Sequence, residues 1–299
     1  RVYPPEFIAL GSVIRDFLNP DFILIGESDR ASGDLIERIY QGTCENRPAS
    51  ARMSLVNAEL TKLCLNAFLT MKISFANEVA ALCEAVPGAD VDAVTGAVGL
   101  DTRIGPKYLK GGLGFGGPCF PRDNQALQAA AAAFGRELRL SPKVVDVNRD
   151  VVDRLLETIV QRTPPGAGVA VLGLSYKPGT PVIEASQSLE LAARLAGAGY
   201  RVNVHDPLAI QAAREFLPPG VNCRDDPYDC LRGVAGLILA TPWPEYLRLD
   251  WSRARTLMTK DAYILDCWRM LKDTPPEGLE YLAPGLGGRA GRREERLGK

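Results

Sequence analysis

The carboxyl-terminal half of the chain alternates short apolar runs with segments of helical spacing. The runs cover residues 169–174, 202–205, 236–240 and 263–266, and the clearest helical segment covers 188–196. Apolar runs this short are typical of strands that are buried on both faces, and their alternation with helices is typical of a parallel sheet. This half is therefore predicted to be an α/β domain. Pro164-Pro165-Gly166 precedes it and is the predicted linker.

The middle of the chain has a different pattern. The stretch from Asn57 to Val86 contains neither proline nor glycine, and apolar residues recur in it every three or four positions. This spacing predicts one long amphipathic helix that ends at Pro87-Gly88. Further helices are predicted over 91–98, 124–134 and 142–161, with Ser141 as the N-cap of the last. Nearer the start of the chain, a strand over 22–26 and a helix over 33–41 predict half of an α/β unit.

Composition narrows the classes of chemistry. The 35 basic and 36 acidic residues nearly cancel, so no basic field is available for nucleic acid, and no apolar run is long enough to cross a membrane. His205 is the only histidine, so any triad, Cys–His pair or histidine-based metal site would have to be built around it. The seven cysteines are scattered without a C-x-x-C, and no signal peptide is visible. We therefore expect no metal site, no disulfide framework and a cytoplasmic location.

The segment KGGLGFGGPCFPRD, residues 110–123, is the most informative one for chemistry. Its five glycines allow the backbone to approach a ligand closely, and their N–H groups can line an anion site. Within it, residues 112–117 match G-x-G-x-x-G. No predicted strand precedes that match, and Pro118 and Pro121 interrupt the helix that should follow. The match is therefore not interpreted as a dinucleotide fingerprint.

The same segment presents one cysteine. In the functional interpretation the loop displays Cys119 as a nucleophile, with Asp123 four residues later near the start of the next helix. The alternative is a glycine-rich turn that contains an incidental buried thiol, which is the more common fate of a single cysteine.

Two lysines have positions that suit a ligand. Lys62 and Asn66 are four residues apart on the predicted long helix, so both project from one face near its apolar stripe. Lys177 follows the apolar run 169–174, at the sheet edge where α/β proteins bind ligands. The alternative for each lysine is an ordinary solvated side chain.

Taken together, these segments resemble the UDP-glucose/GDP-mannose dehydrogenase family, with its UDP-glucose 6-dehydrogenases as the nearest match. The matching stretches occur in the family's order between about residues 2 and 270, and the glycine–cysteine segment is the most specific of them. They are PEF (5–7), GS (11–12), FLNPD (17–21), AELTKLCLNAF (58–68), DTRIG (101–105), GFGGPCFPRD (114–123) and LGLSYK (172–177).

The resemblance implies a fold and a division into domains. We expect an α/β protein in which residues 1–56 are the end of an NAD-binding Rossmann domain. A central all-helical dimerisation domain would cover 57–163, and a Rossmann-like UDP-sugar-binding domain with a parallel sheet would cover 164–287. A disordered tail is expected over 288–299. The family's opening strand that leads into a G-x-G-x-x-G is not found, so we expect the chain to be a fragment.

The resemblance also implies an NAD-dependent, four-electron oxidation of a nucleotide sugar's C6 alcohol to a carboxylate, with UDP-glucose as the expected substrate. Cys119 would hold the aldehyde as a thiohemiacetal and then as a thioester, which divides one difficult oxidation into easier steps. Lys62 would stabilise oxyanion charge and Asn66 would fix the oxygen. Asp123 and Glu6 would assist the attacking water.

Further residues are assigned to binding by the same resemblance. Substrate contacts are expected from Arg103 across a homodimer, and from Tyr108, Lys110, Phe115, Gly116, Lys177 and Arg269. Arg122 is assigned to the cofactor. Position 184, often an arginine on the NAD pyrophosphate, is Glu184 here, and Leu10 replaces a frequent glutamate. A carboxylate repels pyrophosphate, so the sequence argues against the family's NAD contact at Glu184.

Two other functions are compatible with the sequence. One is a non-catalytic module that binds a nucleotide sugar and dimerises through the long helix, with higher oligomers left open. The other is a GDP-mannose dehydrogenase, which shares the cysteine loop. For the 299 residues alone we expect no detectable NAD reduction.

Overall fold

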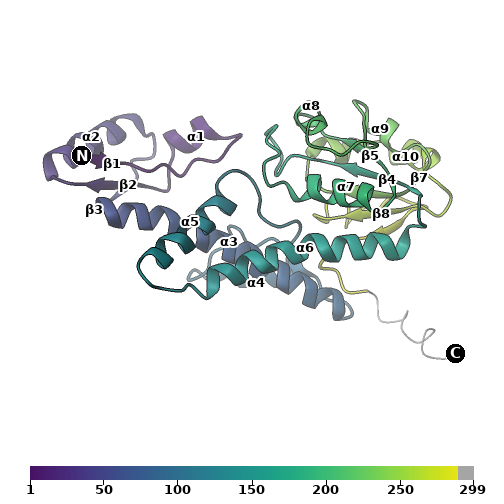
Figure 1. Ribbon diagram of the computed structural model, residues 1–299, viewed down its shortest axis with the longest axis horizontal. Helices are drawn as coiled ribbons and strands as arrows, with labels where there is room; N and C mark the ends of the chain where they lie inside the picture. The colour runs from purple at the N-terminus through teal and green to yellow at the C-terminus, as the bar shows by residue number, and fades with distance from the viewer. Residues whose placement is uncertain (289–299) are drawn as a thin grey trace. The chain divides into compact units, whose positions relative to one another are not determined.

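The computed structural model describes residues 1–288, so the expected disordered tail lies outside the described residues apart from Gly288. The chain divides into two compact units (Figure 1). The amino-terminal unit comprises Arg1–Phe68 and Arg122–Leu138. The carboxyl-terminal unit comprises Leu69–Pro121 and the chain from Arg139 onwards.

The amino-terminal unit contains a three-stranded sheet in the order β1-β2-β3. Its elements are β1 (Val2–Tyr3), α1 (Val13–Leu18), β2 (Phe22–Glu27), α2 (Arg30–Thr43) and β3 (Ala49–Ser54). β2 is parallel to β3 and antiparallel to β1. The predicted strand over 22–26 and helix over 33–41 are confirmed as β2 and α2. β3 was not predicted, because its small and polar residues carry no apolar run.

The predicted long helix is confirmed as α3 (Leu55–Ala85), which has 31 residues. Three more helices match the sequence prediction: α4 (Val91–Leu100), α5 (Phe120–Ala133) and α6 (Leu140–Arg162). α5 begins earlier than predicted, and Pro121 does not interrupt it because a proline in the first turn removes no helical hydrogen bond. The predicted cap of α6 is wrong: Arg139 is the cap residue, and Ser141 lies inside the first turn.

The predicted parallel sheet is confirmed in the carboxyl-terminal unit, with the order β6-β5-β4-β7-β8-β9. Its strands are β4 (Gly168–Leu172), β5 (Arg201–His205), β6 (Asn222–Cys223), β7 (Val234–Leu239), β8 (Tyr263–Asp266) and β9 (Glu280–Leu282), and each neighbouring pair is parallel. Its helices are α7 (Gln187–Gly197), α8 (Ile210–Arg214), α9 (Pro227–Cys230) and α10 (Trp251–Leu257), with a 3₁₀ helix over Pro244–Arg248.

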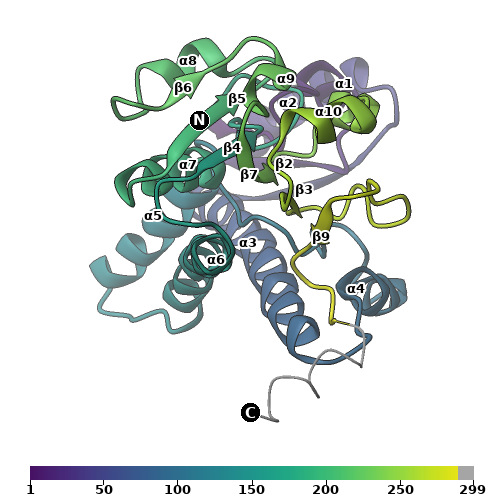
Figure 2. The ribbon, with the colours of Figure 1, turned by 90° about the vertical axis from the view of Figure 1, so that its right-hand side faces the viewer.

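Alternate side chains of this sheet enter two separate cores. Val169 and Val171 of β4 pack with α6 and α7, whereas Ala170 and Leu172 pack with residues of α9 and α10. α6 also contacts α3, where Ser74 Oγ donates to the carbonyl of Val144 at 2.9 Å; Figure 2 shows α6 nearly end-on beside α3. The sheet is therefore covered on both faces, which explains its uninterrupted apolar runs. Among residues 1–288, no helix is both long and apolar enough to cross a membrane.

Candidate active site

In the amino-terminal unit, a hydrogen bond joins two of the predicted catalytic residues. Asn66 of α3 donates from Nδ2 to Oδ2 of Asp123 at 2.6 Å, and both side chains are buried. Asp123 lies in the first turn of α5, where free backbone N–H groups favour a carboxylate. Its other oxygen accepts from Nε of Arg122 at 3.1 Å. The structure therefore fixes the orientation of the Asn66 amide.

Lys62 lies one helical turn before Asn66. Its Nζ donates to the carbonyl oxygen of Glu6 at 2.7 Å and stands 4.5 Å from the centre of the Phe7 ring, within the range of a cation–π contact. The Glu6 carboxylate accepts from the hydroxyl of Tyr40 at 3.1 Å. Burial, together with the charge on Glu6, raises the pKa of Tyr40 to about 12. Lys62 is therefore held against the segment that carries Glu6, and is not an ordinary solvated lysine.

In the carboxyl-terminal unit, Cys119 has an exposed thiol directly before the start of α5. Its exposure contradicts the alternative of an incidental buried thiol. Burial raises the pKa of five of the seven cysteines, which disfavours the thiolate that acts as a nucleophile. These five are Cys44, Cys83, Cys223, Cys230 and Cys267. Cys64 is the other exposed thiol.

Aromatic side chains surround the cysteine end of the glycine loop. The ring of Phe120 makes edge-on contacts with Tyr108 and Phe115, with centroids 6.2 and 6.3 Å away. Tyr176 also lies nearby: burial raises its pKa to about 12, with smaller effects from Cys119 and Tyr108. Tyr108 has a φ of 64°, a left-handed backbone that is uncommon for a tyrosine. The predicted residues Tyr108, Phe115 and Cys119 thus share one neighbourhood.

Side-chain amides from three helices hold the glycine loop. Its backbone N–H groups donate to Asn77 of α3, Asn148 of α6 and Gln187 of α7, at distances of 2.6–2.8 Å. The donors are Gly112, Phe115 and Gly114 respectively, and Gly117 donates to the carbonyl of Glu184 at 2.9 Å. The prediction that the N–H groups of the glycines line an anion site is therefore wrong for Gly112, Gly114 and Gly117, because each already has an acceptor inside the protein.

The glycines instead permit close packing inside the protein, whereas the sequence predicted a close approach to a ligand. A Cβ at Gly112 would lie 2.8 Å from the Trp268 ring, and one at Gly116 would collide with the carbonyl oxygen of Ala185. At Gly117 it would lie 2.7 Å from the Tyr176 ring, and the φ of 79° there also favours glycine. The backbone of the glycine loop thus lies close to other parts of the same chain. No strand directly precedes Gly112 in the described structure, which agrees with rejecting a dinucleotide fingerprint.

Lys177 follows β4 at the point where the strand order of the large sheet reverses. β5 and β7 flank β4 on opposite sides, and the crevice beyond the carboxyl ends of such strands is where open α/β sheets bind ligands. Lys177 is partly buried there, with Nζ 5.6 Å from the centre of the Tyr176 ring. The topology therefore supports the predicted ligand-facing position.

Asp206, which belongs to none of the predicted site segments, organises this crevice. Its Oδ2 accepts from the backbone N–H groups of Leu174 and Ser175 at 2.7 and 2.9 Å and from Nε1 of Trp243 at 3.1 Å. Its Oδ1 accepts from two N–H groups of the following turn. Because one carboxylate fixes the turn after β4, it also fixes the start of the segment that leads to Lys177. The signal in the sequence that could have identified Asp206 is its position directly after the apolar run 202–205.

His205 is a structural residue of the same strand end. It is buried, and its Nδ1 lies 3.0 Å from the hydroxyl of Tyr246, which also lies 3.2 Å from the His205 carbonyl oxygen. Burial lowers the pKa of its imidazole. Among residues 1–288, no cluster of three His, Cys, Asp or Glu side chains could hold a metal.

Comparisons with known proteins decide the family. Residues 56–150 match the central domain of the UDP-glucose/GDP-mannose dehydrogenase family, and residues 170–273 match its UDP-binding domain. The chain belongs to this family. It is 35% identical over 290 residues to the UDP-glucose 6-dehydrogenase TuaD of Bacillus subtilis, and 39% identical over 281 residues to the UDP-glucose 6-dehydrogenase AglM of Haloferax volcanii.

Structural comparison gives the same result. A UDP-glucose dehydrogenase from the archaeon Pyrobaculum islandicum matches 95% of the chain with a TM-score of 0.84 and 35% identity. The two curated relatives match 95% and 93% of the chain. The chain in turn spans 61% and 64% of their lengths, and 63% of the archaeal protein.

Arg269, which was predicted to contact the substrate, is buried and bonded inside the protein. Its side chain is fully buried and pairs with Asp92, with the Nε and Nη2 donors each at 2.9 Å. It also donates to the carbonyl oxygens of Gly111 and Pro284. Its assignment to the substrate stays a prediction that this geometry does not favour, because these bonds would have to break.

The remaining predicted binding residues differ in exposure. Arg103 is exposed and paired with Asp101 at 2.6 Å, and Lys110 is exposed. Arg122 and Glu184 are exposed as well, whereas Phe115 and Gly116 are buried in the glycine loop. Leu10 lies in the segment between β1 and α1. The two buried loop residues have a structural explanation. Arg103 and Arg122 already have carboxylate partners in Asp101 and Asp123, so binding a ligand there would compete with these pairs.

Proposed function

We propose that the protein to which this chain belongs is an NAD-dependent nucleotide-sugar 6-dehydrogenase that converts UDP-glucose to UDP-glucuronate. The observation that carries this proposal is the exposed thiol of Cys119 at the end of a loop that three helices hold in place. The names of the relatives support a nucleotide sugar as the substrate class. The proposal covers the whole protein, because its relatives extend beyond the matched region.

The residues of this chain would supply the covalent part of the reaction. The Cys119 sulfur adds to the carbonyl carbon of the C6 aldehyde, and the carbonyl oxygen takes up a proton to give a thiohemiacetal. After that adduct is oxidised to a thioester, water attacks it and returns the free thiol and the carboxylate. A cysteine is suited to both roles because its thiolate is a strong nucleophile and a good leaving group.

Polar residues of the amino-terminal unit would act on the oxygen atoms. The Lys62 ammonium would stabilise oxyanion charge, and Asn66 would orient the oxygen. Asp123 and Glu6 would direct the water. The buried Asn66–Asp123 pair supports this assignment, because it keeps an amide and a carboxylate in fixed orientation without exposing either to bulk solvent.

NAD, when bound, accepts hydride from the substrate carbon. The described residues do not fit a complete dinucleotide site: the G-x-G-x-x-G match lies in a loop whose N–H groups are already bonded, and position 184 is a glutamate. We therefore assign no hydride-transfer step to named residues. The role of Arg122 toward the cofactor remains part of the proposal.

We also propose a homodimer formed through α3. Phe75 and Leu82 are seven residues apart on this helix, so they share one face, and they are 47% and 63% exposed. Exposed apolar side chains in a row are typical of a protein interface. Arg103 would then be available to reach the substrate of the partner subunit.

Replacement of Cys119 by serine in the full-length enzyme tests the covalent role. We expect UDP-glucuronate formation to fall by several orders of magnitude, because a serine hydroxyl is a far weaker nucleophile than a thiolate at neutral pH. C64S is the matched control, since it removes the other exposed thiol. Undiminished turnover to the uronic acid by C119S would refute the proposal.

Calorimetry with UDP-glucose, UDP-galactose and GDP-mannose tests the substrate. We expect UDP-glucose to bind most tightly. Preference for GDP-mannose would instead place the protein with the GDP-mannose dehydrogenases, and binding without any turnover of the full-length protein would favour a non-catalytic module.

A further inference from the structure

A large cavity in the carboxyl-terminal unit lies apart from the residues assigned to the reaction. It has a volume of about 720 Å³, within the range of small-molecule sites, and lies between α3, α6 and the segment 279–288. Neither Cys119, Lys110 nor Lys177 lines it, and of the glycine loop only Gly112 does. Its occupant would therefore be different from a sugar bound at the thiol.

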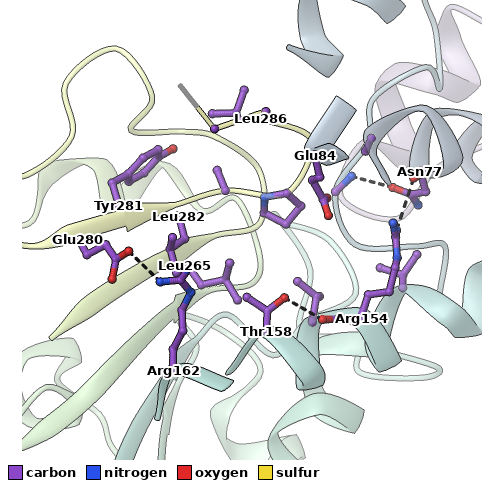
Figure 3. A pocket seen from close by; sticks show the side chains of 18 of the residues that line it. Asn77, Glu84, Arg154, Thr158, Arg162, Leu265, Glu280, Tyr281, Leu282 and Leu286 are labelled. Atoms are coloured by element: carbon purple, nitrogen blue, oxygen red, sulfur yellow. Dashed lines mark hydrogen bonds and ion pairs between the residues drawn. The ribbon is translucent and has the colours of Figure 1, made fainter. Parts of the chain in front are cut away.

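Two residues that line the cavity, Asn77 and Arg154, have buried hydrogen-bond donors without acceptors among the described residues. Asn77 is 1% exposed, and its Nδ2 has no partner among the described residues; the same is true of Nη1 of Arg154. Figure 3 shows these two side chains next to each other, with Nη2 of Arg154 3.4 Å from the carbonyl oxygen of Asn77. Buried donors without acceptors cost free energy, so a bound acceptor would be stabilised here.

The backbone of Gly112 fixes the orientation of the Asn77 amide. Its Oδ1 accepts from the N–H of Gly112 at 2.8 Å, so the atom left over is the donor Nδ2. Arg154 forms no ion pair with any described carboxylate, whereas Arg162, further along the same helix α6, pairs with Glu280 at 2.8 Å. The unused positive charge is therefore concentrated at Arg154. A guanidinium of this kind favours a carboxylate or a phosphate.

The other walls define the rest of the ligand. Val151, Leu155, Leu265 and Leu282 supply apolar surface. Glu84 lies two helical turns beyond Asn77 on α3, about 10 Å along the axis, and accepts from the N–H of Gly285. A second anionic group at that end would be repelled. The ligand should therefore carry one anionic group on an uncharged body.

We propose that this cavity binds a small organic anion, a carboxylate or phosphate monoester with an apolar body, through Arg154 and Asn77. The inference does not rest on the proposed dehydrogenase activity. Because Asn77 also holds Gly112, an occupant would contact a residue that positions the glycine loop, and this gives the site a route to influence that loop.

Binding is tested by calorimetry on the full-length protein with 1-naphthoate and 1-naphthyl phosphate, with neutral 1-naphthol as the comparison. We expect saturable binding of at least one anion, and binding of 1-naphthol at least about tenfold weaker. The two anions distinguish a carboxylate from a phosphate ligand. Absence of binding by both, or equal binding of naphthol, would overturn the proposal.

Variants locate the site. N77D keeps the oxygen that accepts from Gly112 and replaces the donor with a second oxygen, so it should weaken anion binding at least about tenfold while preserving the loop contact. R154M should do the same while keeping an apolar stem. R149Q is the control, because Arg149 is an exposed arginine on the same helix. K177A tests whether the anion binds instead in the crevice beyond β4, and we expect this variant to bind it as the wild type does.

The outcomes of these variants are decisive. Full-strength binding by both N77D and R154M would overturn the assignment, as would a loss in R149Q or K177A equal to that in R154M. If R154M does not fold, N77D alone still decides, since its shape is nearly unchanged. The amide resonance of Gly112 provides a second readout in the wild type: we expect it to shift on anion binding, and an unshifted resonance would overturn the contact through Asn77.

Discussion

Asn148 makes two hydrogen bonds to the backbone of Phe115, accepting from its N–H at 2.7 Å and donating to its carbonyl at 3.0 Å. The carbonyl of Asn148 itself accepts from Nε2 of Gln187, whose Oε1 accepts from the N–H of Gly114. Two helices thus hold adjacent residues of the glycine loop through one connected set of amides. Such a network gives a glycine-rich segment a defined conformation that its own sequence does not impose.

We expect N148A to loosen this loop and to lower turnover more than it lowers substrate affinity. Both bonds to Phe115 would be lost, and a displacement of about 1 Å at a reacting group costs up to about 100-fold in rate. N148D retains the acceptor and should keep more activity than N148A. The measurement is kcat and KM of the full-length enzyme, with R149A as an exposed control on the same helix.

A purely structural role for Asn148 would give a different result. In a C64S background, iodoacetamide reports on Cys119 as the exposed thiol that remains among residues 1–288. We expect the alkylation rate in N148A to differ from that of the parent, with N148D in between. Identical alkylation rates and unchanged kcat in all three proteins would contradict a positioning role.

The buried pair in the amino-terminal unit gives a second prediction. N66A removes the donor to Asp123, and D123A leaves the Asn66 amide without its acceptor in a buried position. We expect each to lower the free energy of unfolding by about 1–3 kcal/mol. D123N, which keeps the shape, should lower it less but should still reduce hydrolysis of the thioester. Urea denaturation measures the change in stability, and uronic acid release measures hydrolysis. A D123A variant with wild-type stability and wild-type uronic acid release would contradict this prediction.

The elements of this fold follow closely from local patterns in the sequence. The long helix needed only the absence of proline and glycine and an apolar spacing of three to four residues. The strands β4, β7 and β8 needed only apolar runs, because both faces of the sheet are buried. β3 escaped prediction because five of its six residues are small or polar and Met53 is its only large apolar residue. It forms a strand because it pairs with β2.

The candidate site was only partly predictable, for a physical reason. Cys119, Lys62, Asn66 and Asp123 belong to recognisable segments, but the amides that hold the loop lie 33 to 73 residues from their partners. A polar residue on a helix gives no sign in a single sequence that it faces the interior. The same applies to Arg269, whose partner Asp92 is 177 residues away, so its burial could not be foreseen.

The Arg269–Asp92 pair gives a third prediction, for stability. Burial alone would raise the pKa of the Asp92 carboxyl, but the hydrogen bonds from Arg269 and Lys272 outweigh this effect and hold it below its usual value. D92A would leave a fully buried guanidinium without its counter-charge, so we expect a loss of about 3–5 kcal/mol in unfolding free energy. Because the folded pKa is lowered, this contribution is present at neutral pH and is lost as the pH falls through the folded pKa.

D101A is the control for the same measurement. Asp101 also pairs with an arginine, but the side chain of Arg103 is 87% exposed, and exposed pairs contribute about 0–1 kcal/mol. Equal losses in D92A and D101A by urea denaturation at pH 7 would show that burial does not determine the contribution of Arg269.

His205 gives a prediction for pH. Burial lowers the pKa of this imidazole below its usual value of 6.5, so the unfolded chain binds a proton more readily than the folded one. Its contribution to stability is therefore complete above about pH 6.5 and is lost as the pH falls from there toward the folded pKa. H205N keeps a polar atom near Tyr246 but does not titrate in this range. We expect the urea midpoint of the 299-residue chain to fall more steeply between pH 7.5 and 5.5 than that of H205N.

Because His205 is the only histidine of this chain, its proton signal can be followed directly. We expect a single imidazole Hε1 resonance that titrates below pH 6.5 in the folded chain. The neutral ring is favoured since its Nδ1 shares a hydrogen bond with the buried Tyr246 hydroxyl, whereas a charge there would be desolvated. A resonance that titrates at or above 6.5, or parallel midpoints for the wild type and H205N, would show that burial does not set the protonation of this residue.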